Sequence, residues 1–363
     1  MKKAIAILTI LVLAVVVYSC KKSSTGAQDV KAVSLVLPAT PDNYFPNNGF
    51  GNNDSINRVA TLGRVLFYDT HLSVNNAISC GSCHKQALGF ADNSSFSTGY
   101  QGMLTKRNSP ALNDLQFKEF LFWDGRENNI SNLPLRPMTN HVEMGITDLS
   151  ALPQKLAALP YYTQLFNNAF GTNQGITADQ ISGAIGLFIS AITSGNSRLD
   201  QYLAGNTSAL TAQEIYGKSL FDTKYNCAGC HISNGGGGYS GTEAGFKDIG
   251  LDNAYTDMGR GTITGLATDN GTFRVPDLTN VGITAPYMHD GRYQTLGDVI
   301  DHYSHNIMNS PNLDPLLRDN TGKAIQMNIS DQEKAAIVAF LNTLTDFNII
   351  TDPKFSTPFK VIN

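Results

Sequence analysis

Two copies of one short pattern, Cys-x-x-Cys-His, dominate the chemistry that this sequence could perform. The first copy is Cys80-x-x-Cys83-His84 and the second is Cys227-x-x-Cys230-His231. Two thiols at this spacing can form thioethers with the two vinyl groups of one haem, and the adjacent histidine then becomes an axial ligand of the iron. A redox dithiol or half of a zinc site would use the same residues, but zinc needs a further ligand pair and neither motif has one nearby. The pattern therefore predicts two covalently attached c-type haems.

The fifth cysteine, Cys20, follows an apolar run at 4–18 that is preceded by two lysines. Such a run is short for a membrane-spanning helix and is typical of a signal-peptide core. The residues around Cys20 resemble the lipobox of bacterial lipoproteins, although an ordinary cleaved signal is the alternative. We expect a signal peptide at 1–19, a lipid on Cys20 that anchors the chain to a membrane, and a tether at 20–50. The protein would then be a periplasmic or cell-envelope lipoprotein of a Gram-negative bacterium, with no cysteine left for a disulfide.

The two halves of the chain repeat the same residue patterns, which indicates an internal duplication. The segment 63–69 precedes the first motif and 217–222 precedes the second, and each begins with glycine and a basic residue and contains Leu-Phe. Downstream of each motif an Asp-Gly-Arg triplet follows, at 124–126 and at 290–292. Two diverged copies of one haem domain account for this repetition.

The length of the chain agrees with a division into two domains, and its charge bears on its partners. A chain of 363 residues can form two modest domains with their own cores, and we place them at 51–205 and 206–347, followed by a C-terminal extension at 348–363. The net charge of −4 and the lack of a basic stretch beyond the first few residues argue against nucleic acid as a partner.

Helices joined by long loops, with little β-structure, account for most of the chain. Two capping boxes, Thr211-x-x-Glu214 and Ser330-x-x-Glu333, predict helices at 213–221 and 333–345. A third helix at 177–192 carries apolar residues at helical spacing, and we expect it to lie buried between the two halves.

A series of further motifs surrounds the two haem patterns. They are Leu66-Phe67-Tyr68-Asp69, Arg107-Asn108-x-Pro110, Phe122-Trp123-Asp124-Gly125-Arg126, Glu143-Met144-Gly145 and Thr284-Ala285-Pro286-Tyr287-Met288-His289-Asp290-Gly291. With these motifs in this order, the chain resembles the bacterial dihaem cytochrome c peroxidase and MauG superfamily from about Ser55 to about Thr345. The resemblance implies a mainly α fold of two cytochrome c-like haem domains, in which peroxide reacts at the N-terminal haem and the C-terminal haem transfers electrons.

Two residues carry the chemistry that the resemblance implies. Glu143 matches the family's distal acid/base, which moves a proton from the inner to the outer oxygen of peroxide. A carboxyl group in an apolar pocket has a raised pKa, which suits it to this transfer. Trp123, the only tryptophan, matches the residue between the two haems. Its indole could relay electrons there, and simple aromatic packing against a haem edge is the alternative.

Other residues would hold the cofactors. Arg107 and Arg274 have the chemistry to pair with haem propionates. The resemblance also implies one calcium ion between the haems, with Asn108 supplying its side-chain oxygen and Thr284 and Pro286 their backbone carbonyls. Oxygen ligands of this kind suit Ca²⁺.

The outer face of each haem departs from the common family pattern. Many members block the N-terminal haem with a histidine just before Arg-Asn, but the segment 99–101 stands in that place and contains none. We therefore expect a five-coordinate N-terminal haem that is open to peroxide. On the C-terminal haem the position usually held by methionine is Tyr303, as in MauG-like members, with His302, His305 and Met308 as neighbouring alternatives.

The pocket beside Glu143 also lacks a polar group that the family often has. Leu133 occupies the position where a glutamine often precedes the glutamate, which makes the pocket more apolar. His141 could supply a replacement, or it could be a loop histidine without a catalytic part.

These features predict a dihaem cytochrome c peroxidase. Hydrogen peroxide would be reduced to water at the haem on His84, with electrons entering at the haem on His231 from a small periplasmic cytochrome or cupredoxin. The first alternative is a MauG-like oxidase that forms a high-valent state and oxidises a protein or organic substrate, and Tyr303 favours it. The second alternative is a dihaem electron carrier without catalysis, against which Glu143 argues. A homodimer is compatible with the sequence.

Overall fold

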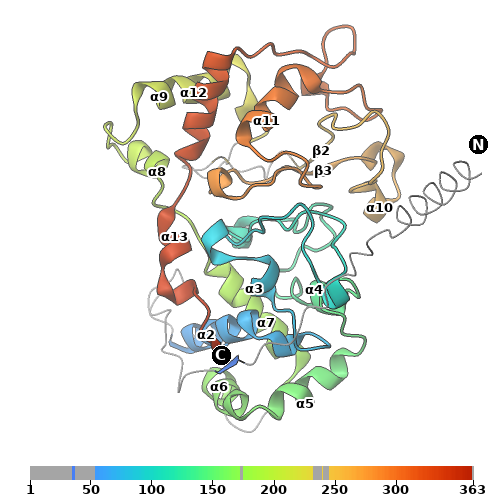
Figure 1. The fold of residues 1–363 in the computed structure, drawn as a ribbon, viewed down its shortest axis with the longest axis vertical. Helices are drawn as coiled ribbons and strands as arrows, with labels where there is room; N and C mark the ends of the chain where they lie inside the picture. The colour runs from blue at the N-terminus through green and yellow to red at the C-terminus, as the bar shows by residue number, and fades with distance from the viewer. Residues whose placement is uncertain (1–34, 37–53, 172–174, 232–238, 240–244, 362–363) are drawn as a thin grey trace, which may run out of the picture.

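The computed structural model describes residues 35–36, 54–171, 175–231, 239 and 245–361, which form two lobes (Figure 1). Cys20 and the expected signal peptide lie outside the described residues. The N-terminal lobe contains α2 (Asp54–Tyr68), α3 (Cys80–Cys83), α4 (Leu135–Thr139), α5 (Leu152–Ala157), α6 (Pro160–Phe170) and α7 (Ala178–Ser190). The C-terminal lobe contains α8 (Arg198–Leu203), α9 (Ala212–Ser219), α10 (Gly261–Thr264), α11 (Leu296–Asp301) and α12 (Asp331–Asn342). A last helix, α13 (Phe347–Thr351), leads from the C-terminal lobe back to the N-terminal lobe.

The strands that the structure describes are short and form two small antiparallel sheets. In the first sheet β1 (Leu35–Val36) pairs with β4 (Lys360–Val361), and in the second β2 (Phe246–Lys247) pairs with β3 (Phe273–Arg274). The predicted mainly α fold with long loops and little β-structure is therefore confirmed. Among the described helices, none is long and apolar enough to cross a membrane.

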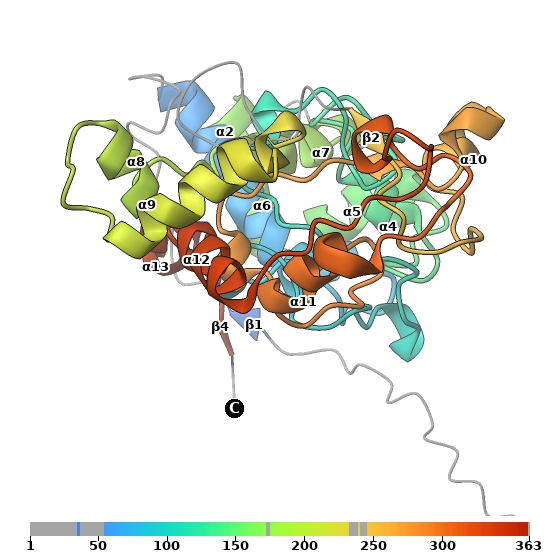
Figure 2. The same cartoon turned by 90° about the horizontal axis from the view of Figure 1, so that it is seen from above.

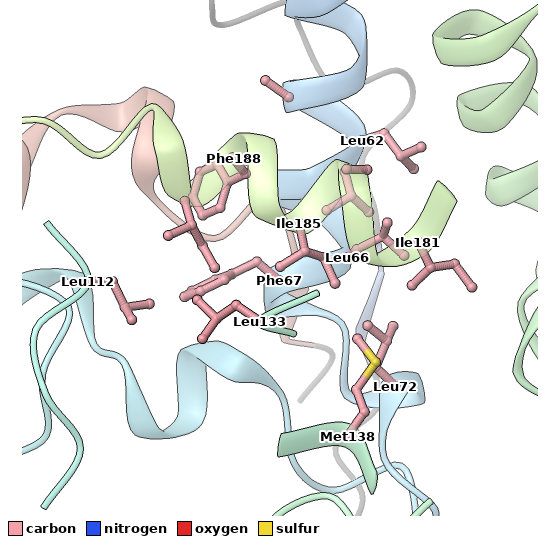
Figure 3. Packing of buried hydrophobic residues seen from close by; sticks show 14 of the residues in the cluster. Leu62, Leu66, Phe67, Leu72, Leu112, Leu133, Met138, Ile181, Ile185 and Phe188 are labelled. Carbon is pink, nitrogen blue, oxygen red and sulfur yellow. The ribbon is translucent and has the colours of Figure 1, made fainter. Parts of the chain in front are cut away.

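The core of the N-terminal lobe is built on the crossing of α2 and α7. Leu62, Leu66 and Phe67 of α2 pack against Ile185 and Phe188 of α7, as Figure 3 shows, and all five side chains are buried. The two backbones approach closely because α2 carries a glycine at the crossing. A β-carbon at position 63 would overlap the backbone carbonyl of residue 184 and meet the β-carbon of residue 188.

The C-terminal lobe repeats this crossing with α9 and α12, which lie side by side in Figure 2. A β-carbon on Gly217 would overlap the carbonyl of Ala336 and lie 2.9 Å from the β-carbon of Phe340. Gly217 thus occupies the same place in its lobe as Gly63 does in the other. In each lobe, a glycine faces an alanine and the phenylalanine that follows this alanine by four residues. The repetition supports the predicted internal duplication.

The loops beyond the two haem motifs repeat as well. Asp124 and Asp290 each accept hydrogen bonds from the arginine two residues later. The intervening glycines, Gly125 and Gly291, have φ of +66° and +65°, a backbone region that suits glycine. These Asp-Gly-Arg turns place two equivalent loops at corresponding points of the two lobes.

The predicted helices are found, but they end early and one of them packs elsewhere. Both capping boxes form, at the starts of α9 and α12, but α7 ends at Ser190, α9 at Ser219 and α12 at Asn342 instead of Thr345. The chain turns away there because the Leu344 carbonyl accepts the backbone N–H of Asn280. The expectation that helix 177–192 lies between the halves is wrong, since α7 packs on α2 inside the N-terminal lobe.

Buried polar contacts join the two lobes. The Lys118 ammonium lies 2.6 Å from the Asp277 carboxylate, and the lysine side chain is only 3 % exposed. Asn280 donates to Ser194 Oγ at 2.8 Å and accepts the backbone N–H of Asp346 at 2.8 Å. Loss of one partner would leave the other polar group buried and unpaired, so these contacts favour one fixed arrangement of the lobes.

Candidate functional site

The first haem motif forms a short helix that carries both thiols and delivers the histidine. Cys80–Cys83 is α3, and its N-cap Ser79 forms a capping box with Ser82. The spacing of three residues places the two thiols on one face of this turn. His84 follows directly, and its Nδ1 lies 2.9 Å from the carbonyl oxygen of Phe90.

In the second motif Cys227–Gly229 forms a 3-10 turn, and Nδ1 of His231 lies 3.2 Å from the carbonyl oxygen of Pro276. A carbonyl only accepts, so Nδ1 of each histidine carries the proton and Nε2 is left as the ligand atom. Burial lowers the pKa of both imidazoles, that of His231 to about 4, which keeps them neutral. Both histidines are therefore oriented and neutral, as iron ligands should be.

The competing interpretations of the two motifs do not fit the structure. All four cysteines of the motifs are unpaired. Burial raises the pKa of the Cys80 and Cys227 thiols to about 12, whereas a reactive dithiol needs a lowered pKa. Within the described ranges, no group of three His, Cys, Asp or Glu side chains is arranged to hold a metal ion such as zinc.

A cavity of about 430 Å³ surrounds the second motif and extends to the N-terminal lobe. Cys227, Cys230 and His231 line it, and so does Tyr303. Burial raises the pKa of the Tyr303 phenol. Negative charge on the nearby thiols of Cys227 and Cys230 raises it further. Tyr303 thus shares the cavity with His231, as a second ligand of the same haem iron would.

The alternatives to Tyr303 point elsewhere. His302 is buried, and its two ring nitrogens lie 3.3 Å from the Tyr293 hydroxyl and 2.9 Å from the Ile249 carbonyl. His305 and Met308 are exposed on the surface. The geometry therefore favours Tyr303 over these three residues.

Glu143 lies beside the first motif in a largely enclosed position. Burial raises the pKa of its carboxyl group, against the opposing effects of Arg126 and of a hydrogen bond from Asn140. Its charge in turn contributes to the raised pKa values of Cys80 and Cys83, which are dominated by burial. Asn140 donates to Oε1 at 2.6 Å, which leaves Oε2 as the oxygen that can exchange a proton with a substrate.

The backbone around Glu143 is held by the loop at 99–102. The N–H of Tyr100 donates to the carbonyls of Val142 and Glu143, each at 2.9 Å. This loop is the segment in which we expected no blocking histidine, and it supports the backbone of the glutamate. His141 is exposed and Leu133 is buried in the core shown in Figure 3, so neither adds a polar group to the enclosed side of Glu143.

Trp123 and the expected calcium ligands line the same cavity as Tyr303. Asn108, Thr284 and Pro286 come from both lobes and meet at its wall. The Nδ2 of Asn108 donates to the Ser94 carbonyl, which leaves Oδ1 as the ligand atom, and the Asn108 carbonyl accepts the indole N–H of Trp123 at 2.9 Å. The three residues expected to bind Ca²⁺ therefore line one cavity, and each has an oxygen of the kind that Ca²⁺ prefers.

Arg274 fits the role of a propionate partner. Its side chain is buried and lines the cavity, and its hydrogen bonds are to the carbonyls of Phe122 and Val275. Burial lowers the pKa of this guanidinium, although Asp277 opposes the effect. A buried cation at a cavity wall is stabilised by an anionic group within the cavity, which a haem propionate supplies.

The structure gives Arg107 different partners from the expected propionate. Its Nε and Nη2 bind the two carboxylate oxygens of Asp257 at 2.6 and 2.7 Å, and Nη1 binds Asp124 at 2.5 Å. Two carboxylates therefore balance its charge, and the arginine joins the lobes. The sequence contains no signal for Asp257, because it lies 150 residues away in a loop without a motif.

Comparison with known proteins shows which family the chain resembles. Residues 57–208 match the family described as di-haem cytochrome c peroxidase, and residues 215–345 match cytochrome c. The chain is 32 % identical to the methylamine utilization protein MauG of Methylorubrum extorquens, over 78 % of this chain and 77 % of that protein. It is also 32 % identical to the cytochrome c551 peroxidase of Nitrosomonas europaea, over 83 % and 82 %.

Two solved structures have the same fold. A MauG-like protein associated with microbial copper homeostasis matches with a TM-score of 0.75 at 33 % identity, covering 83 % of this chain and 93 % of that one. The diheme peroxidase BthA from Burkholderia thailandensis matches with a TM-score of 0.67 at 21 % identity, covering 82 % and 89 %.

Proposed function

Because the chain belongs to the dihaem cytochrome c peroxidase and MauG family, we propose that it reduces hydrogen peroxide to water beside Glu143. It is an oxidoreductase with two covalently bound haem c groups, which we assign to the Cys80 and Cys227 motifs. The observation that carries the proposal is the enclosed carboxyl group of Glu143 next to the first motif. When bound, the haems supply the iron that holds peroxide and the two electrons that reduce it.

The protein's own part in the reaction is to move protons and to exclude water. Glu143 in its carboxylate form accepts a proton at Oε2 from hydrogen peroxide and returns it to the departing oxygen. With two further protons and two electrons from outside, one peroxide then yields two waters. Asn140 holds the other carboxylate oxygen, so the proton is exchanged at a fixed point. A pure electron carrier has no use for such a group.

The path of the electrons is the second part of the proposal. They enter at the C-terminal lobe, from a small cytochrome or cupredoxin that gives one electron at a time, and they reach the N-terminal lobe by way of Trp123. The position of the Trp123 indole on the cavity wall, hydrogen-bonded to Asn108, supports this route. The Trp123 indole can pack against a haem edge and also relay electrons at this position.

A MauG-like oxidase is the second candidate, and Tyr303 is the observation that favours it. A phenolate ligand would lower the reduction potential of the C-terminal haem and favour storage of oxidising equivalents over rapid electron transfer. The relatives include the methylamine utilization protein MauG and a cytochrome c551 peroxidase, at equal identity.

One experiment separates the candidates. The diferric protein is mixed with one equivalent of hydrogen peroxide in a stopped-flow spectrometer, with and without a reduced small cytochrome. The peroxidase predicts rapid oxidation of two cytochromes per peroxide. The oxidase predicts a long-lived spectral intermediate with slow cytochrome oxidation. An unchanged spectrum would leave only the electron carrier.

Replacement of Tyr303 by phenylalanine tests the assigned ligand. The variant keeps the ring in the cavity and removes the only atom that can bind iron, so we expect the low-spin signal of the C-terminal haem to change in the ferric electron paramagnetic resonance spectrum. Tyr287→Phe is the matched control, because Tyr287 lines the same cavity but donates its hydroxyl to the Val281 carbonyl. If both variants retain the parent signal, Tyr303 is not the ligand.

Two further assignments belong to the proposal. A calcium ion is held by Asn108, Thr284 and Pro286, which is supported by their meeting at one cavity wall. The chain is exported and anchored to a membrane through Cys20, which is supported by the apolar run and the lipobox-like residues before it.

A further inference from the structure

The segment that follows the C-terminal lobe returns to the N-terminal lobe and contacts the surroundings of the first haem motif. It comprises α13, the short turn Pro353–Phe355 and β4, and Figure 1 shows it beside α2. We call residues 347–361 the return segment. Phe355 is its innermost side chain, 2 % exposed, and packs within the core of the N-terminal lobe.

Three residues near the first motif bind the return segment. Tyr68, whose ring packs against Gly81 of α3, donates its hydroxyl to the Phe355 carbonyl at 2.6 Å. Gln86, two residues after His84, donates Nε2 to the carbonyls of Ile349 and Asp352, each at 2.9 Å. Arg64, on the same helix as Tyr68, binds the Ser356 and Pro353 carbonyls. The segment therefore contacts the chain on both sides of Cys80–His84.

A fourth neighbour of the return segment is Phe90, which holds His84 directly. Its carbonyl accepts the proton of His84 Nδ1, and its backbone has a φ of +60°. A bulky residue in this left-handed region is strained, and such strain persists only where packing enforces it. The Phe90 ring is fully buried between Phe67 and Phe355, with ring centroids 6.1 and 6.3 Å away and near-perpendicular planes.

We propose that the return segment, through Phe355, positions the axial histidine of the N-terminal haem. The Phe355 ring holds Phe90 in its strained conformation, and this conformation directs the carbonyl at His84 Nδ1. A strong bond to Nδ1–H makes the imidazole a more basic iron ligand, which stabilises the ferric state and lowers the reduction potential. Phe355 is thus a positioning residue. The inference rests on the proposed attachment of a haem at the first motif.

Phe355→Ala in the full-length protein with both haems attached tests this inference. Without the ring we expect Phe90 to relax and its carbonyl to turn from His84. The midpoint potential of the N-terminal haem should then rise, and the iron–histidine stretching band of the reduced N-terminal haem should shift to lower frequency in resonance Raman spectra. The C-terminal haem should keep its potential, which makes it an internal reference. Neither readout depends on turnover, so failure of the peroxidase proposal would leave this test valid.

Phe359→Ala is the matched control, because Phe359 belongs to the same segment and is buried, but packs on Tyr161 of α6. It should lower the thermal stability without shifting either the potential or the Raman band. Phe355→Leu keeps apolar volume against Phe90 and should restore most of the parent values. Where the alanine variant does not fold, Phe355→Leu should still shift the potential and the Raman band slightly in the same directions. The inference would be overturned if Phe355→Ala and Phe359→Ala shifted the potential and the Raman band equally. It would also be overturned if neither Phe355→Ala nor Phe355→Leu shifted them.

Discussion

Replacing Glu143 by glutamine should lower kcat for peroxide reduction by about 10²- to 10⁴-fold, the usual contribution of a positioned acid/base. Glutamine keeps the size of the side chain, and its amide oxygen can still accept the hydrogen bond from Asn140. Its amide nitrogen, however, cannot accept a proton as Oε2 does. Because the substitution leaves the haem motifs and His84 intact, the two haem spectra should remain those of the parent. Steady-state oxidation of a reduced cytochrome under saturating peroxide measures the loss.

His141→Gln is the matched control for this variant. His141 lies two residues away in the same loop, but it is exposed to solvent. We expect its replacement to leave kcat within about twofold of the parent, since an exposed side chain without contact to the enclosed carboxyl moves no proton there. A large loss in His141→Gln, or a Glu143→Gln variant that retains full activity, would assign the proton transfer to another group.

The pH dependence of the reaction follows from the same carboxyl group. Burial raises the pKa of Glu143 above its ordinary value of 4.5. The carboxylate form accepts the proton from peroxide, so kcat/KM should rise with pH through this raised pKa and fall as the pH drops below it. The residual activity of Glu143→Gln should not show this rise of kcat/KM with pH. Its absence distinguishes the loss of an acid/base from a general structural defect.

Gly217→Ala should destabilise the C-terminal lobe by about 1–3 kcal/mol, as insertion into a well-packed crossing usually does. In an exposed helix the same change would stabilise by up to about 1 kcal/mol, because alanine has the higher helix propensity. The sign reverses here because the added β-carbon would overlap the Ala336 carbonyl and press on Phe340. Gly63→Ala should have the same effect in the N-terminal lobe, where the clash is with Ala184.

Gly183→Ala provides the control, because Gly183 lies inside α7 and a β-carbon there would meet no atom within 4 Å. This change should raise the melting temperature slightly or leave it unaltered. Differential scanning calorimetry of the three variants measures the contrast. If Gly217→Ala and Gly183→Ala move the melting temperature in the same direction, the close approach of α9 and α12 does not limit the packing of the lobe.

The structure also shows which parts of the site could be predicted from nearby residues. The motifs at Cys80 and Cys227 could be identified without knowledge of the fold, because the thiol spacing and the adjacent histidine define the covalent chemistry within five residues. The capping boxes at Thr211 and Ser330 were equally local, and both form in the structure. The mainly α class and the duplication followed from these local patterns and from their repetition.

Other predictions depended on residues that are distant in sequence, and the sequence left these open or misplaced them. Counting along the chain could not separate Tyr303 from His302, since the choice depends on which side of a one-turn π-helical segment faces the cavity. The apolar face of 177–192 predicted burial correctly but not the partner, which is α2 rather than the lobe boundary. The pairing of Arg107 with a propionate stays a prediction, and its contacts with Asp257 and Asp124 were not indicated by the sequence.

The two Cys-x-x-Cys-His motifs and the helix caps were determined by the sequence alone, because each rests on covalent geometry or on hydrogen bonds within one turn. The tertiary structure decided what surrounds the two histidines. Phe355 reaches Phe90 and Asp257 reaches Arg107 only because two lobes and a return segment pack together. Contacts between residues so far apart depend on that packing, which no local pattern specifies.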